Sequence, residues 1–414
     1  MLTERLYRQD PYIVSIRAKV LEINAGKGCF DVVFDRTVLF PEGGGQPSDL
    51  GSVTTDAGAT YEISHAFDKA LDGPVYHRIK ADAQDLALTV GEEVTLDLDF
   101  DQRFQNMQRH SGEHILSGAF YLTCGGANKG FHMGKDYITI DIDLGGRTVT
   151  AEELRAAERA ANQAIWDDLP FHTEFYPNAA AANEGPVRKV VDLEGVISVV
   201  FVGDPDDPFD CVACCGTHVQ SAGEIGLIKI YKTEVNKGMN RIYFDCGSRA
   251  FDRVCEEIDI LTELANRYST AKENLLHKVD VEAERSKALR ETLSSLTAFY
   301  REQRSAEFAR LWSEAGGAVH IAADELDPDD LLKFAFACIE KVAPSDALAV
   351  ITHQGSRTAI LVSSGNSYDC GKLVKEHASP AAARAADGRT PRGPSSRASK
   401  RCSSLYRSSS DFVI

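Results

Sequence analysis

Four side chains able to bind a transition metal lie in two pairs, and each pair has a spacing of four residues. His110 and His114 belong to His-Ser-Gly-Glu-His, and Cys214 and His218 belong to Cys-Cys-Gly-Thr-His. Histidines four residues apart stack on one face of a helix, one turn from each other. Three imidazoles and one thiolate form a ligand set that zinc favours. We therefore predict one zinc site made of His110, His114, Cys214 and His218.

Each pair alone also has an ordinary explanation. Two histidines at this spacing occur on helix surfaces and in cores, and a free cysteine such as Cys214 is often simply buried. The two pairs together are much more specific than either half, because they complete a four-ligand set.

Composition limits the class of protein. The chain has 414 residues, with 45 Lys and Arg against 62 Asp and Glu and a net charge of −17. This balance argues against non-specific binding of nucleic acid over the whole surface, yet it permits a local basic face. Ten scattered cysteines, no signal peptide and no apolar run of about 18 residues predict a cytoplasmic location without a membrane.

The N-terminal part, residues 1–95, has the composition of β-strands. Segments 12–21, 29–34, 75–79 and 93–98 are separated by Gly, Asp and Pro turns, which predicts a small β-barrel. Between them lies Phe-Pro-Glu-Gly-Gly-Gly-Gln-Pro-Ser-Asp-Leu-Gly (40–51). Its glycines allow either close approach to a ligand or a long turn between strands.

Residues 96–250 predict an α+β domain. A helical pattern runs from Asp101 through both histidines to about Leu122 and ends at two glycines, and Thr150 opens a second helix with a capping box. Strands are expected at 137–143, 196–202, 225–231 and 241–245. One ligand pair thus lies on a helix, and the other ends a Pro- and Asp-rich loop that follows a strand.

Three C-terminal segments follow. Residues 249–315 contain no Gly or Pro and have apolar residues at helical spacing, which predicts a long helix or helical hairpin over 251–316. This helical segment would serve as an arm or as the contact of a homodimer. Alternatively, it is a helical pair that packs on its own domain. Residues 317–377 predict a small α/β domain. The tail 378–414 is irregular and basic, and we consider an RNA-binding arm, disorder or a reading-frame change; its cations are Arg384, Arg389, Arg392, Arg397, Lys400, Arg401 and Arg407.

These motifs resemble the editing domain of alanyl-tRNA synthetases and the free-standing AlaX proteins. The two metal motifs, the glycine-rich segment 40–51 and the segment 237–250 occur in the family's order, and the resemblance spans roughly residues 1–250. The helix and the segment after it are similar to the long AlaX type with a DHHA1-like domain. The family's usual ending of that domain is replaced here by the Ser/Arg tail, and Glu113 occupies a position that is often Thr or Ala in the synthetases.

The resemblance implies a zinc-dependent hydrolase that deacylates mischarged tRNA(Ala), chiefly seryl and also glycyl. The zinc either activates water or positions the aminoacyl group. The resemblance to the synthetases also implies nucleotide or ATP binding. We do not expect tRNA charging, because the roughly one hundred residues before His110 have the composition of a β-barrel. The residues implied are Glu113 and His132 for catalysis and Gly44, Gly45, Gln46, Asn128 and Thr217 for substrate binding.

Two other functions fit parts of the pattern. His110-x-x-Glu113-His114 matches a metallopeptidase motif in which Glu113 is the base and Glu194 a downstream ligand. The second alternative is a non-catalytic tRNA-binding module with a closed, structural zinc. For the contact with tRNA we predict Lys237 and Arg241, within a basic face beside the zinc that also contains Arg103, Arg109, Lys229, Lys232 and Arg249.

Overall fold

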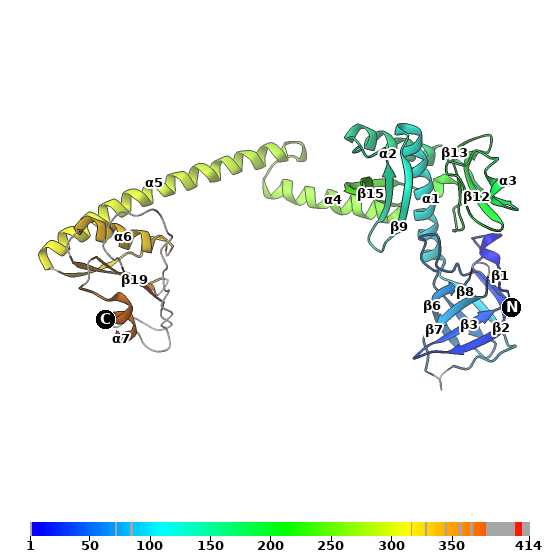
Figure 1. Ribbon diagram of the computed structural model, residues 1–414, viewed down its shortest axis with the longest axis horizontal. Coiled ribbons are helices and arrows are strands. Elements are labelled where there is room, and N and C mark those ends of the chain that lie inside the picture. The colour runs from blue at the N-terminus through cyan, green and yellow to red at the C-terminus, as the bar shows by residue number, and fades with distance from the viewer. Residues whose placement is uncertain are drawn as a thin grey trace. The chain divides into compact units, whose positions relative to one another are not determined.

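The structure is a computed structural model that describes residues 2–70, 73–82, 86–315, 317–327, 329–343, 346–355, 358–364, 367–377 and 402–407. The chain divides into two units, Met1–Glu263 and Leu264–Ile414 (Figure 1). Of the predicted tail, only Cys402–Arg407 is described, and it forms strand β19. The other tail residues, including all but one of its cations, lie outside the described residues.

The first unit begins with a closed antiparallel barrel, as predicted. Its strands follow the order β2-β3-β7-β6-β5-β8, and alternate side chains point into a core that includes Val20, Val53 and Leu96. The bounds are β2 Ser15–Ala25, β3 Phe30–Phe34, β5 Gly51–Thr55, β6 Thr60–Asp68, β7 Val75–Ile79 and β8 Glu93–Leu98. A short parallel pair, β1 Glu4–Arg5 and β4 Arg36–Thr37, flanks η1 Leu6–Arg8. The glycine-rich segment connects β4 to β5.

Helix α1, Phe100–Cys124, leaves the barrel and carries the first ligand pair. It begins after Asp99, whose side chain accepts a hydrogen bond from the Gln102 amide, and ends at Gly125 with φ 69°. Helix α2, Ala151–Trp166, begins with the predicted capping box of Thr150 and Glu153. Both helices pack through one core on the sheet β14-β15-β10-β9 (Figure 1); its strands are β9 Ala127–Met133, β10 Ile138–Asp143, β14 Ile228–Asn236 and β15 Met239–Cys246.

A smaller sheet carries the second ligand pair. It contains β11 Phe171–Tyr176, β12 Ile197–Asp204 and β13 Asp207–Ala213, with helix α3 Ala179–Ala182 beside it. The Pro- and Asp-rich stretch predicted as a loop is instead the β12–β13 turn and strand β13, and the loop begins only at Cys214. Another prediction is wrong at Ile225, which ends the 3-10 helix η2 Ala222–Ile225, so that the next strand starts at Ile228.

The stretch predicted as one helix or a hairpin contains two helices, α4 Gly247–Arg267 and α5 Leu275–Ala315, with η3 Lys272–Asn274 between them. Helix α4 ends two residues before Ser269, which has φ 49°. In the second unit, α5 and α6 Leu331–Val342 pack on the sheet β16-β17-β18-β19, which confirms the expected α/β segment. Its other elements are β16 Ala318–Ala322, β17 Ala347–His353, β18 Thr358–Ser364 and α7 Cys370–His377.

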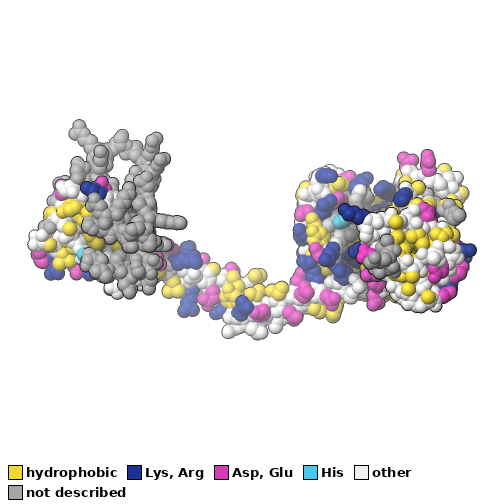
Figure 2. All heavy atoms as spheres, turned by 90° about the horizontal axis from the view of Figure 1, so that it is seen from below, with side chains coloured by type: hydrophobic (Ala, Val, Ile, Leu, Met, Phe, Trp, Pro, Cys, Tyr) yellow, Lys and Arg dark blue, Asp and Glu magenta, His cyan; other side chains and the backbone are white. Residues whose placement is uncertain are grey.

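Helix α5 exposes large apolar side chains, among them Leu289, Leu293 and Leu296 (Figure 2). A homodimer through this helix stays a prediction. No helix within the described residues is long and apolar enough to cross a membrane.

Candidate metal centre

The structure brings the two predicted ligand pairs together. One ligand atom from each of His110, His114, Cys214 and His218 lies within 4.8 Å of the others. The first two residues face one side of α1, and the last two lie in the loop after β13. All three histidines are buried, and Cys214 is partly buried. A helix face and a strand-following loop therefore meet at one point, as the spacing predicted.

Glycines allow the close approach that this cluster requires. A Cβ atom at Gly118 of α1 would lie 2.9 Å from the Phe209 carbonyl oxygen and 3.1 Å from Asp210 Cβ, so only glycine lets β13 approach the helix. At Gly216, between the two loop ligands, a Cβ atom would lie 2.2 Å from Cε1 of His110. The Gly-Thr pair between Cys214 and His218 is thus fixed by contact with the helix histidine.

Gln46, from the glycine-rich segment of the barrel, orients His110. The Gln46 Oε1 atom accepts a hydrogen bond from the Thr217 backbone N–H at 3.1 Å, so Oε1 is an acceptor, and it lies 2.7 Å from His110 Nδ1. Nδ1 must therefore carry the proton, which leaves the Nε2 lone pair for a metal. Gln46 Nε2 also donates to Thr217 Oγ1 at 2.9 Å. Gln46 and Thr217, both predicted to bind substrate, thus position the cluster itself.

Asp210 orients His114 in the same manner. Its Oδ2 lies 3.2 Å from His114 Nδ1, and both side chains are buried. Burial raises the pKa of Asp210, but His114 and Arg188 outweigh this effect and hold that pKa below its ordinary value. The arrangement is the carboxylate–histidine pair that commonly supports a zinc ligand. Sequence reasoning missed Asp210, because it precedes Cys214 by four residues with no recognised motif.

The atoms of the cluster fit a metal ion. Among the described residues, His114 Nε2 and both ring nitrogens of His218 are buried without a hydrogen-bond partner. Burial raises the pKa of the Cys214 thiol, but His110 and His114 beside it lower that pKa to about 5. Unpaired buried nitrogens are costly without a partner, and a thiolate is the form that binds zinc. This donor set therefore suits one tetrahedral zinc ion.

The glycine-rich segment forms part of the wall of the site. Gly44 has φ 59° and Gly45 has φ 85°, and Cβ atoms there would approach Cys215 Sγ at 3.1 Å and the Phe131 ring at 2.7 Å. Phe131 in turn stacks on the His110 ring with centroids 5.2 Å apart. The structure therefore places Gly44 and Gly45 close to residues that adjoin the cluster, and their predicted approach to a ligand stays a prediction.

Glu113 and Asn128 form a polar network next to the cluster. Ser117 Oγ and Asn128 Nδ2 each donate to Glu113 Oε1 at 2.6 Å, whereas Glu113 Oε2 accepts no hydrogen bond within the described residues. A register shift in the β9–β10 pairing makes Lys129 an extra residue, a β-bulge. The bulge places Asn128 and Phe131 on the same face of β9, toward α1.

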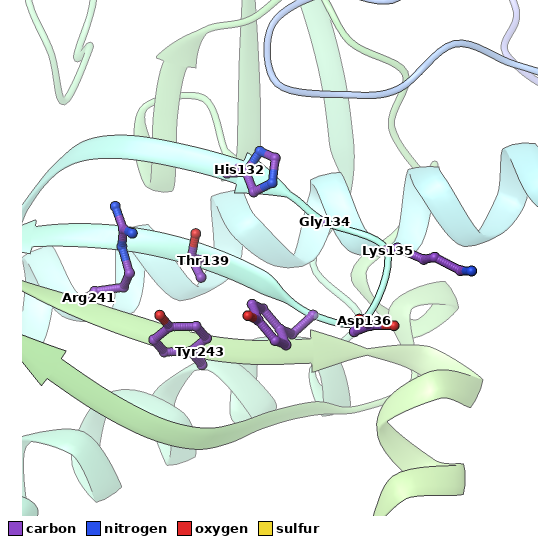
Figure 3. A pocket seen from close by; sticks show the side chains of 8 residues that line it. His132, Gly134, Lys135, Asp136, Thr139, Arg241 and Tyr243 are labelled. Carbon is purple, nitrogen blue, oxygen red and sulfur yellow. The ribbon is translucent and has the colours of Figure 1, made fainter. Parts of the chain in front are cut away.

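The structure does not bring His132 to the cluster. His132 follows Phe131 on β9 and is exposed on the opposite face of the sheet, because side chains alternate along a strand. There it lines a cavity of about 310 Å³ with Thr139 and Arg241 from the neighbouring strands (Figure 3). His132 therefore does not face the cluster, and its predicted catalytic role stays a prediction.

The predicted basic face is wrong for its two helix arginines. Arg103 is fully buried and pairs with Asp49 of the glycine-rich segment, and its Nη2 donates to the Val38 carbonyl. Arg109 is also buried and pairs with Asp245. Sequence proximity to His110 did not reveal that acidic partners far along the chain enclose both guanidinium groups.

The predicted tRNA-binding residues lie on the β14–β15 hairpin. Lys237 is exposed at its turn, where Lys237 has φ 51° and Gly238 has φ 79°. Arg241 makes two hydrogen bonds of 2.8 Å to Asp141, and this pairing holds the pKa of the carboxyl below its ordinary value. Glu194, the downstream ligand of the peptidase alternative, is exposed and lies outside the cluster.

Comparisons with known proteins show what this chain resembles. Residues 197–243 match the family described as the threonyl and alanyl tRNA synthetase second additional domain. The alanyl-tRNA editing protein AlaX-L of Pyrococcus horikoshii is 34% identical over 257 residues, which are 62% of this chain and 61% of that protein. The alanine–tRNA ligase of Pyrobaculum aerophilum is 32% identical over 337 residues, 80% of this chain and 36% of the ligase. That of Methanothrix thermoacetophila is 32% identical over 381 residues, 88% and 39% respectively.

The matched segment contains Cys214 and His218, so the second ligand pair lies in a segment similar to the additional domain of these synthetases. Over a wider stretch the chain is similar to this alanyl-tRNA editing protein and to the alanine–tRNA ligases, which confirms the resemblance seen in its motifs. The chain spans less than two thirds of the length of each of these three relatives.

Proposed function

We propose that this chain hydrolyses the ester bond of mischarged tRNA(Ala), chiefly Ser-tRNA(Ala) and also Gly-tRNA(Ala), and releases free tRNA and amino acid. The observation that carries the proposal is the buried cluster of three histidines and one cysteine, oriented by Gln46 of the barrel and Asp210 of β13. The names of the relatives, alanyl-tRNA editing protein and alanine–tRNA ligase, support the substrate class. Nucleotide or ATP binding stays a prediction.

The four ligands would hold zinc, which when bound supplies either Lewis acidity or a fixed point for the aminoacyl group or water. Beside them, Glu113 has the chemistry of a general base or of a hydroxyl acceptor. Its Oε1 is held by Ser117 and Asn128, and its Oε2 remains available to accept a proton or a hydrogen bond. Gly44, Gly45 and Phe131 form the wall against which the amino acid would lie.

The same carboxylate accounts for the preference for serine over alanine. A site that hydrogen-bonds the serine hydroxyl leaves a buried acceptor without a partner when alanine binds, which is costly. We assign this acceptor to Glu113, positioned by Asn128. For the contact with tRNA we propose Lys237 and Arg241 of the β14–β15 hairpin; Arg241 lines the cavity of Figure 3.

The test is a deacylation assay with Ser-tRNA(Ala), Gly-tRNA(Ala) and Ala-tRNA(Ala) as separate substrates. We expect the seryl ester to be hydrolysed far faster than the alanyl ester, and the Glu113→Gln variant to lose most of this activity. Glu152→Gln, on the exposed side of α2, is the control. Cleavage of peptides with intact esters would favour the metallopeptidase, and zinc retention without any hydrolysis would favour the tRNA-binding module.

A further inference from the structure

Arg188 lies behind the metal cluster, in the loop between α3 and β12, and was not among the residues singled out by sequence. Its Nε donates to Asp210 Oδ1 at 2.5 Å, and its Nη2 reaches Asp210 Oδ2 at 3.4 Å. The same Oδ2 lies 3.2 Å from His114 Nδ1. Arg188, Asp210 and His114 thus form a continuous chain that ends at a proposed metal ligand.

Each member of the chain is shielded from water. The side chain of Asp210 has no exposed surface, that of His114 is 2% exposed and that of Arg188 is 9% exposed. A carboxylate in such a place is very costly without a countercharge, and a planar guanidinium is the group that pairs with it through two hydrogen bonds. Arg188 therefore supplies the positive charge that keeps Asp210 ionised, so that the carboxylate can accept a hydrogen bond from the His114 ring.

The loop that carries Arg188 is itself held in place. The Arg188 backbone N–H donates to the Cys211 carbonyl at 2.7 Å, directly beside Asp210. Asn183 and Val191 exchange two hydrogen bonds of 2.8 Å that close the part of the loop containing Arg188. Ala182 and Val191 are buried in one small core with Phe201 and Cys211. The guanidinium group thus approaches Asp210 from a rigid backbone rather than from a flexible arm.

We propose that Arg188 is a positioning residue of the metal centre, which acts through Asp210 to fix the His114 ring with Nε2 toward the metal. The proposal rests on the proposed zinc site. Partners of this kind, one step removed from the ligands, commonly change metal affinity 10–100-fold when they are replaced. A merely structural ion pair would affect folding stability and leave the affinity unchanged.

The experiment measures zinc affinity by competition with a chromophoric chelator in the full chain. The variants are Arg188→Met, Asp210→Asn and the double variant. Arg5→Met is the matched control, because Arg5 is similarly buried, with a side chain 7% exposed, and pairs with Asp68, which bonds no proposed ligand. We expect Arg188→Met and Asp210→Asn each to weaken zinc binding roughly 10–100-fold and Arg5→Met to leave it within about twofold of the parent.

Two further results separate positioning from general damage. The double variant is expected to bind zinc no more weakly than Asp210→Asn alone, since Arg188 acts through Asp210. Arg188→Lys, which keeps the charge but not the planar fork, is expected to recover part of the loss. In thermal melts, Arg188→Met and Arg5→Met both lower the Tm of the metal-free protein, but only Arg188→Met reduces the rise on adding zinc.

Unchanged affinity in Arg188→Met, an equal loss in Arg5→Met, or additive losses in the double variant would each overturn the proposal. If Arg188→Met fails to fold, Arg188→Gln and Arg188→Lys replace it in the same measurement. Zinc affinity equal to that of the parent in both variants would then overturn the proposal. A parent protein that binds no zinc would instead refute the metal centre itself, so the two failures are distinguishable.

Discussion

Gln46 Oε1 lies 2.7 Å from His110 Nδ1, although the two residues are 64 positions apart and belong to the barrel and to α1. This amide also bonds Thr217 in the ligand loop. We predict that Gln46→Met, which keeps the shape and removes the hydrogen bonds, weakens zinc binding roughly 10–100-fold in a chelator competition assay. Gln46→Glu retains the acceptor and should lose less. Zinc binding in Gln46→Met as tight as in the parent would show that the barrel does not support the ligand.

Metal content gives the most direct check of the cluster. The purified protein should carry about one zinc per chain, the number that one four-ligand site holds. The double variant His110→Ala/Cys214→Ala should carry none, measured by atomic emission. Cys215→Ser is the control, since Cys215 adjoins Cys214 but is exposed and outside the cluster. Full zinc retention in the double variant would refute the site.

A methyl group at Gly216 should disrupt the centre. Its Cβ would lie 2.2 Å from His110 Cε1 and 2.8 Å from Gln46 Oε1, two groups with little freedom to move. We expect Gly216→Ala to lose about 1–3 kcal/mol of stability, as overpacked sites do, together with zinc. Gly185→Ala, where the nearest atom is 3.5 Å away, should melt like the parent. A stable, zinc-loaded Gly216→Ala variant would contradict this close approach of the ligand loop to α1.

His77 makes the barrel sensitive to acid. Burial lowers the pKa of His77 to about 4 from its ordinary 6.5, and its ring bonds Thr37 and the Val32 carbonyl. Below pH 6.5 the unfolded chain takes up a proton that the folded barrel refuses until about pH 4. Stability is therefore complete above pH 6.5 and falls as the pH drops through this window, by about 3 kcal/mol.

Denaturant unfolding from pH 7 to pH 4 measures this effect. The His77→Gln variant has no group that titrates at this position, so its stability should fall less steeply than that of the parent over the same range. Identical pH profiles for the two proteins would rule out His77 as the source.

Lys237 gives a test of the tRNA contact. Because Lys237 has positive φ, Lys237→Asn removes the charge with a residue that tolerates this backbone. We expect weaker tRNA(Ala) binding and a salt slope smaller by about one. Lys27→Asn, on an exposed barrel turn before Gly28, is the control and should leave the slope unchanged. Arg241→Gln should have the smaller effect, since Asp141 already binds that guanidinium. Equal slopes for Lys237→Asn and the parent would place the RNA contact elsewhere.

The ligand set was predictable because its signal is local. A spacing of four residues places His110 and His114 on one face of a helix, and the same spacing separates Cys214 from His218. To form the site, the fold only has to bring these two pairs together. Their partners Gln46 and Asp210 were not predictable as such, since contacts across 64 and 96 positions leave no periodic trace. His132 was misplaced because strand alternation sends it and Phe131 to opposite faces.

Charge was the other source of error. Lysines and arginines close to the ligands in sequence suggested a basic face, but the sequence does not show which of these side chains are buried. Arg103 and Arg109 find their carboxylates in Asp49 and Asp245, which only the folded chain brings near.

The buried Arg103–Asp49 pair has a consequence for dissecting the chain. A fragment that starts at residue 96 would keep the guanidinium and lose the carboxylate, together with the Val38 and Pro11 carbonyls that also bind it. An unpaired buried charge of this kind typically costs about 3–5 kcal/mol, a large share of a domain's whole stability. The metal-binding half therefore depends on the barrel for the partners of Arg103. We expect the barrel and the metal-binding half to be transferred between proteins most successfully as one piece, because Arg103 of α1 has its partners in the barrel half.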